Sequence, residues 1–146
     1  KIWRYILKKI VGTLSIFLSL SATAAPIVNI EGTKQLCQKA AEAFGSGNPK
    51  KSIEILKPYW PLPVEEIDNL AYQTESQLKM VSSRFGSILG ADFVGTKVAG
   101  NSFVQHTYIG KFEKHAVRYI CVFYKPKEEW VVNAVYWDDQ TPALFN

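Results

Sequence analysis

The C-terminal part of the chain constrains the fold most, because four β-rich runs follow one another with breaks of only a few residues. The runs are rich in Val, Ile, Phe, Tyr and Trp, and they cover residues 91–99, 103–112, 115–125 and 130–137. Strands joined so closely pair as antiparallel neighbours, since a parallel crossover needs a dozen or more residues. The sequence therefore predicts a four-stranded antiparallel meander.

The residues before these runs follow a helical pattern instead. Apolar residues recur at helical spacing in 31–44 and again from Val64 to about Phe85, and Thr33 is placed to cap the first of these helices. Asn48-Pro49 predicts the start of a short second helix, with Asn as the cap and Pro in the first turn. Helices followed by strands indicate a two-layer α+β domain.

This order of three helices and a curved antiparallel sheet resembles the nuclear-transport-factor-2-like, or cystatin-like, cone. The most specific segments are Val122-Phe-Tyr-Lys-Pro126, Trp130-Val-Val132 and Tyr136-Trp-Asp-Asp139, which are similar to small exported members of that superfamily. The Gly47-Asn48 turn also fits the segment between the first two helices there. The resemblance implies a cone over nearly all of residues 25–146. It implies no activity, because the fold hosts isomerases, dehydratases, transport adaptors and immunity proteins.

Residues 1–24 have the pattern of a cleavable secretory signal. Four basic residues precede a short apolar run from Ile10 to Leu20, and Ala22-Thr23-Ala24 fits the small-x-small rule for signal peptidase. The alternative is an uncleaved membrane anchor, but a spanning helix needs roughly 20 mostly apolar residues. We therefore expect a cut after Ala24, an exported and periplasmic (or secreted) domain over residues 25–146, and no stable membrane span after cleavage.

The predicted cleavage changes the charge balance. The chain holds 17 Lys and Arg against 13 Asp and Glu, and the signal contains four of the basic residues, which leaves 13 of each sign in the domain. A balanced domain lacks the basic footprint that binding to nucleic acid or anionic lipid requires. We therefore expect no nucleic-acid partner.

Cys37 and Cys121 are the two cysteines of the chain. In an exported protein an even number of cysteines permits a disulfide, and the alternative is a pair of buried thiols. A bond between them would close a loop of more than 80 residues, for which chain entropy predicts about 4 kcal/mol of stabilisation.

The lengths of the hairpin turns predict which side chains share a face of the sheet. A two-residue turn at 113–114 pairs His106 with Cys121 and Tyr108 with Tyr119, and a four-residue turn at 126–129 pairs Tyr119 with Tyr136. If Cys37 and Cys121 are bonded, this face lies beneath the helices. It is then the concave face, with a candidate ligand pocket lined by His106, Tyr108, Tyr119 and Tyr136. The alternative is that these are core residues whose polar tips find partners inside the protein.

The opposite, outer face of the sheet is a candidate interface. It is predicted to carry apolar and polar side chains together, among them Arg118, Ile120, Val122 and Trp137. An exposed apolar patch usually marks an interface, and the resemblance implies dimerisation through this face. A homodimer is therefore expected, and the alternative is a face partly covered by the C-terminal tail, residues 142–145.

The residues that carry chemistry in other proteins form no recognisable constellation. His106 and His115 lack metal-ligand spacing with the cysteines, so we expect no metal and no cofactor. An isomerase or dehydratase would use His106 with Tyr108 or Tyr136, but no carboxylate is predicted near the middle of the inner face. The sequence favours a non-enzymatic exported domain that binds a partner protein, itself or a small apolar ligand. A small isomerase- or dehydratase-like enzyme is the alternative.

Overall fold

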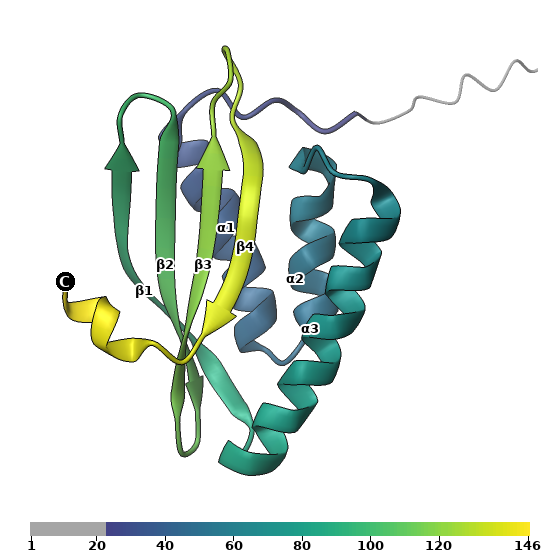
Figure 1. Cartoon of the computed structure of the whole chain (residues 1–146), viewed down its shortest axis with the longest axis vertical. Helices are drawn as coiled ribbons and strands as arrows, with labels where there is room; N and C mark the ends of the chain where they lie inside the picture. The colour runs from purple at the N-terminus through teal and green to yellow at the C-terminus, as the bar shows by residue number, and fades with distance from the viewer. Residues whose placement is uncertain (1–22) are drawn as a thin grey trace, which may run out of the picture.

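The structure, a computed structural model, describes residues 23–146 (Figure 1). The predicted signal peptide therefore falls almost entirely outside the described residues. Within them lie α1 (Ile30–Gly45), α2 (Pro49–Leu56), α3 (Val64–Phe85), β1 (Ile88–Ala99), β2 (Phe103–Phe112), β3 (Ala116–Tyr124) and β4 (Val131–Asp138), with short 3-10 helices η1 (Lys57–Tyr59) and η2 (Thr141–Phe145). The predicted α+β class, with three helices against a curved antiparallel sheet, is confirmed.

Asparagine side chains start the first two helices. Asn29 accepts a hydrogen bond from the backbone N–H of Gly32 at 2.8 Å, and Asn48 accepts one from Lys51 at 3.1 Å. Each satisfies an N–H group that the first turn of a helix leaves without a backbone partner. The predicted cap at Asn48 is confirmed. The predicted cap at Thr33 is wrong, because α1 begins earlier and Thr33 lies inside it.

The sheet is a meander in the order β1-β2-β3-β4, with neighbouring strands antiparallel. The predicted pairs His106–Cys121 and Tyr108–Tyr119 are present between β2 and β3. These residues lie on the inner face, which the helical layer covers (Figure 1). The short turn between β2 and β3 therefore set the register as expected.

The predicted register between β3 and β4 is wrong over the second half of β4. Tyr119 pairs with Trp137 instead of Tyr136. The reason is a register shift in the middle of the strand: Phe123 pairs with Val132, but the residue before it in β3, Val122, pairs with Ala134. Asn133 is the extra residue of a β-bulge at this point, and one extra residue exchanges the two faces of the strand beyond it. Trp137 consequently lies on the inner face and Tyr136 on the outer face.

The core lies between α1 and the inner face of the sheet. Phe44 of α1 is fully buried, with its ring centroid 4.9 Å from that of Tyr119 and 5.4 Å from that of Trp137. A disulfide between Cys37 and Cys121 joins α1 to β3, so the predicted bond is confirmed. Together these contacts hold α1 against the middle of the sheet.

The C-terminal residues return over the outer face of the sheet (Figure 1). The 3-10 helix η2 contacts β3, and Lys97 of β1 donates a hydrogen bond to the main-chain oxygen of Asn146 at 2.8 Å. Ile120 is 0% exposed although it points away from the helices. The tail thus covers part of the outer face, as the alternative prediction had it.

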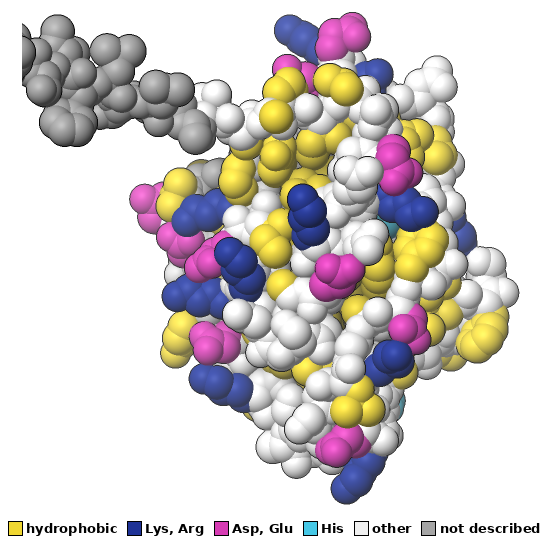
Figure 2. All heavy atoms as spheres, turned by 180° about the vertical axis from the view of Figure 1, so that it is seen from behind, with side chains coloured by type: hydrophobic (Ala, Val, Ile, Leu, Met, Phe, Trp, Pro, Cys, Tyr) yellow, Lys and Arg dark blue, Asp and Glu magenta, His cyan; other side chains and the backbone are white. Residues whose placement is uncertain are grey.

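The surface of the helical layer carries basic and acidic side chains interspersed with one another (Figure 2). Within residues 23–146 no helix has the length and apolar composition that crossing a membrane requires.

Candidate functional site

The structure brings three of the four predicted pocket residues together and separates the fourth. His106, Tyr108 and Tyr119 are buried in the core at 0%, 3% and 2% exposure, whereas Tyr136 is 42% exposed on the outer face. The prediction that Tyr136 shares the concave face is wrong, and the β-bulge in β4 is the reason.

His106 is held between two threonine hydroxyls. Thr33 Oγ1 donates its one hydrogen to the carbonyl of Ile30 at 2.6 Å, so the Nε2–H of His106 must donate to Thr33 at 2.8 Å. Nδ1 is then the acceptor of the neutral ring and receives a hydrogen bond from Thr96 at 2.8 Å. Burial lowers the pKa of His106 to about 4, and the positive charge of Lys34 acts in the same direction. The ring therefore works as a neutral link between α1, β1 and β2.

The two buried tyrosines also serve the core. The hydroxyl of Tyr119 shares a hydrogen bond of 2.7 Å with Ser52 of α2, and burial raises the pKa of Tyr119 well above its usual value. Burial likewise raises the pKa of Tyr108 to about 12, with a smaller contribution from Glu42. Both phenols remain protonated at neutral pH, so they can hydrogen-bond but carry no charge.

A groove of about 540 Å³ lies elsewhere, between the C-terminal half of α3 and the lower ends of β3 and β4 in Figure 1. This volume is within the range of small-molecule sites in proteins, which is roughly 300–1,000 Å³. The groove is lined by Gln77, Met80, Val81, Arg84, Phe85, His115, Val117, Trp137, Asp138 and Asp139.

The groove exists because the apolar stripe of α3 is longer than its cover. Ile67 and Leu78 of this stripe are buried, whereas Val81 and Phe85, further along the same face, are half-buried. Figure 1 shows α3 beside α2 and extending beyond it towards the end of the sheet. The last turns of α3 therefore leave apolar surface facing the sheet across an open space.

Aromatic side chains build the floor and one wall of the groove. Trp137, turned inward by the bulge, rests against Phe44 at the floor. At the wall, the rings of Phe85 and His115 are stacked with centroids 4.3 Å apart, and the guanidinium of Arg84 lies 4.8 Å from the Phe85 ring. Stacking and cation–π contacts of this kind hold flat side chains in one orientation. The wall is thus an ordered apolar surface with a positive charge at its edge.

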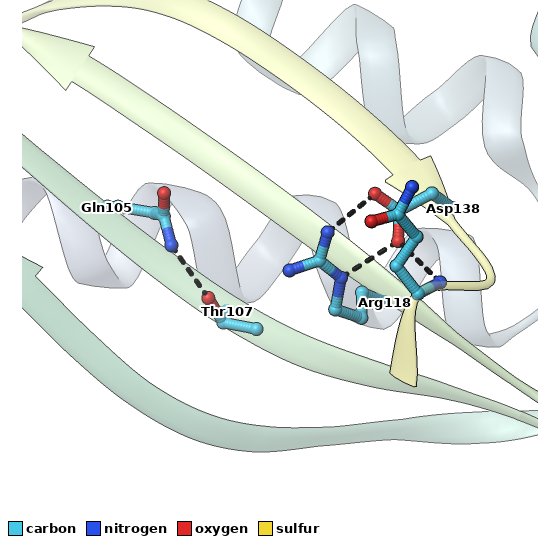
Figure 3. Close-up of polar contacts among 5 residues, drawn as sticks. Gln105, Thr107, Arg118 and Asp138 are labelled. Atoms are coloured by element: carbon cyan, nitrogen blue, oxygen red, sulfur yellow. Dashed lines mark hydrogen bonds and ion pairs between the residues drawn. The ribbon is translucent and has the colours of Figure 1, made fainter. Parts of the chain in front are cut away.

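The opposite margin of the groove is acidic. Asp138 accepts two hydrogen bonds from Arg118, from Nε at 2.8 Å and from Nη2 at 2.7 Å (Figure 3). These bonds hold the pKa of Asp138 below its usual value. The neighbouring Asp139 is exposed and follows the end of β4. A ligand in the groove would therefore meet Arg84 on one side and Asp139 on the other.

Sequence reasoning missed this groove. It placed Trp137 on the outer face, and that placement is wrong because of the bulge at Asn133. A usable signal was nevertheless present in α3, since Val81 and Phe85 continue the apolar stripe past Leu78. An apolar stripe that outruns its covering elements predicts either an interface or a groove.

The other residues predicted for the outer interface do lie on the outer face. Arg118 and Val122 are half-buried there, and Ile120 is fully buried. Part of the predicted interface is therefore covered by the chain's own C-terminal segment. Among residues 23–146 no group of three or more His, Cys, Asp or Glu side chains is placed to hold a metal ion.

The fold is similar to that of a solved structure from Campylobacter jejuni described as an NTF2-like transpeptidase. The two chains are 15% identical, the match covers 68% of this chain and 95% of the other, and the TM-score is 0.48. The likeness concerns the fold. No protein-family model matches the chain, and no curated protein matches it.

Proposed function

We propose that the protein is a binding domain whose groove between α3 and the ends of β3 and β4 takes a small, mainly apolar ligand. The observation that carries the proposal is the groove itself, about 540 Å³ in volume and built on Val81, Phe85 and Trp137. Fully burying an apolar side chain is favourable by roughly 1.5–3 kcal/mol relative to leaving it exposed. Because these three residues of the groove are only half-buried, a ligand that covers them gains part of this free energy as binding affinity. The polar end of the ligand would face Arg84 and Asp139.

The buried histidine supports binding over proton-transfer chemistry. Both ring nitrogens of His106 are occupied by threonine hydroxyls, and its side chain is 0% exposed. A general base must come within hydrogen-bond reach of the proton it removes. The groove lies on a different part of the molecule and presents His115 as a stacked aromatic surface.

The disulfide supports function after export. Bonds between cysteines persist in oxidising compartments such as the periplasm or the extracellular space. Cys37 and Cys121 are joined in the core of the domain. The proposed setting is therefore an exported domain, with its groove open to molecules outside the cytoplasm.

The test is a fluorescence titration with the dye 1-anilinonaphthalene-8-sulfonate, which carries an aromatic body and one charged end. Val81→Asp should weaken binding at least about tenfold, because it places a negative charge against the apolar wall and repels the sulfonate of the dye. Tyr72→Asp is the matched control, since Tyr72 is on the same helix, 72% exposed and outside the groove. Equal dye affinity in both variants would overturn the proposal. If Val81 proves to matter for dye binding, native mass spectrometry of protein taken from its own compartment would identify the physiological ligand.

A further inference from the structure

A second cavity lies on the other side of the sheet, between the outer face of β1–β3 and the C-terminal segment. Its volume is about 390 Å³. It is lined by Val94, Gly95, Thr96, Lys97, Gln105, Thr107, Arg118, Ala143, Leu144 and Asn146. This lining differs from that of the α3 groove in being mainly polar on the side of the strands.

Apart from Thr96, whose hydroxyl bonds to His106 on the inner face, the polar side chains that the sheet contributes to this lining come from three adjacent strands and point to the same side. Lys97 of β1 is paired with Gln105 of β2, and Arg118 of β3 completes the set. Gln105 donates to the hydroxyl of Thr107 at 3.3 Å (Figure 3). Because the Thr107 oxygen accepts this bond, its own hydrogen remains for another acceptor. The cavity is therefore lined by a hydroxyl donor together with the cationic side chains of Lys97 and Arg118.

Arg118 presents one end of its guanidinium to this cavity. Nε and Nη2 are bonded to Asp138, and Figure 3 shows the remaining nitrogen, Nη1, pointing along the sheet towards Gln105 and Thr107. The planar group can serve two partners at once, since its five N–H donors are arranged around a rigid fork. The Asp138 ion pair fixes its orientation and leaves Nη1 to a ligand.

Lys97 already holds an oxygen atom. Its Nζ donates to the main-chain oxygen of Asn146 at 2.8 Å, at the end of the segment that roofs the cavity. Ala143 and Leu144 of the same segment form the apolar roof. Lys97 and Asn146 are themselves exposed, so an anion from solution can reach this nitrogen. An oxygen-bearing anion can therefore take the place that the Asn146 oxygen occupies.

The strand beneath the cavity is shaped to leave space for a ligand. The register of β1 shifts between Phe93 and Gly95, and a Cβ added at Gly95 would meet no atom within 4 Å. Bulges of this kind are over-represented beside functional sites, where they redirect side chains. Among the described residues that line the cavity, two are cationic and none carries a carboxylate side chain.

We propose that this cavity binds a small oxyanion, held by Lys97 Nζ and Arg118 Nη1 and by the hydroxyl of Thr107. Charge-assisted hydrogen bonds from two cations favour carboxylate or phosphate oxygens over neutral groups. The site lies on the opposite face of the sheet from the α3 groove. The two proposals are therefore independent, and a negative result for one leaves the other standing.

The experiment is a titration of the ¹⁵N-labelled protein, followed by heteronuclear NMR, with sodium acetate in one arm and inorganic phosphate in the other. Sodium chloride at matched ionic strength corrects for screening. Saturable shifts of the Gly95, Lys97 and Thr107 amides are expected below about 50 mM, a concentration that reveals weak binding. The anion that saturates assigns the site to carboxylate or phosphate. Absence of saturation with both anions overturns the proposal.

Two variants that each remove one positive charge distinguish binding in the cavity from general electrostatic attraction of anions to the protein. Lys97→Met should weaken binding at least about tenfold. Lys111→Met removes the same charge from the same sheet face but outside the cavity, where Lys111 pairs with Asp92 at 3.0 Å. Equal weakening by both variants would refute a defined site. Thr107→Val, which preserves shape, should weaken binding about threefold and provides a second measurement if Lys97→Met does not fold.

Discussion

Acid should destabilise the protein through His106 before it protonates most carboxylates. The imidazole is neutral in the folded state, where burial lowers its pKa from 6.5 to about 4. Between these two pKa values the unfolded chain binds more protons than the folded one. The contribution of His106 is therefore complete above pH 6.5 and is lost as the pH falls towards 4.

The difference between the two pKa values sets the size of this effect. Each pKa unit corresponds to 1.36 kcal/mol, so complete protonation would remove about 3 kcal/mol from the free energy of unfolding. Most of this loss should occur between pH 6.5 and 4. A domain of this size has a total stability of roughly 5–15 kcal/mol, so the loss is easily measured.

The assay is urea unfolding, followed by tryptophan fluorescence at intervals from pH 7 to pH 4. His106→Gln removes the titrating group and keeps a side-chain N–H that can reach Thr33. This variant should be less stable than the natural protein at pH 7, and the gap between them should shrink by about 3 kcal/mol as the pH falls. His115→Gln is the control, because it removes the other histidine from the wall of the groove. A gap between the natural protein and His106→Gln that stays constant with pH would refute the reasoning.

Three further predictions concern the packing of the core, and unfolding free energies measured in urea check each of them. Replacing both cysteines of the Cys37–Cys121 bond with Ala should cost about 4 kcal/mol, because the bond spans 84 residues; a loss below about 1 kcal/mol would contradict the chain-entropy estimate. Gly45→Ala should cost about 1–3 kcal/mol, since a Cβ there would lie 2.6 Å from backbone atoms of Gly90 and Ala91, whereas Gly95→Ala should be nearly neutral. Trp137→Ala should cost about 2 kcal/mol or more and Tyr136→Ala less than about 1 kcal/mol, and the reverse order would show that the bulge in β4 is misplaced.

Local patterns in the sequence determined the elements and most of their pairing. Asn48-Pro49 marks the start of α2 and Gly86 marks the end of α3. The sequence could predict these ends because capping depends on residues that are neighbours in the chain. The short turn after β2 brought His106 opposite Cys121, because a two-residue connection permits little freedom in register. The disulfide was expected on a different ground, the even number of cysteines in a chain with an export signal.

Tertiary packing decided the positions that carry the candidate sites. Asn133 has no local signature of a bulge, and the bulge is visible only in how β4 pairs with β3. Thr33 looked like a helix cap in the sequence, but α1 starts at Ile30 and directs this hydroxyl to His106. Similarly, the groove depends on how far α3 extends past α2. Such features arise from contacts between residues distant in the chain, which neither propensity nor periodicity encodes.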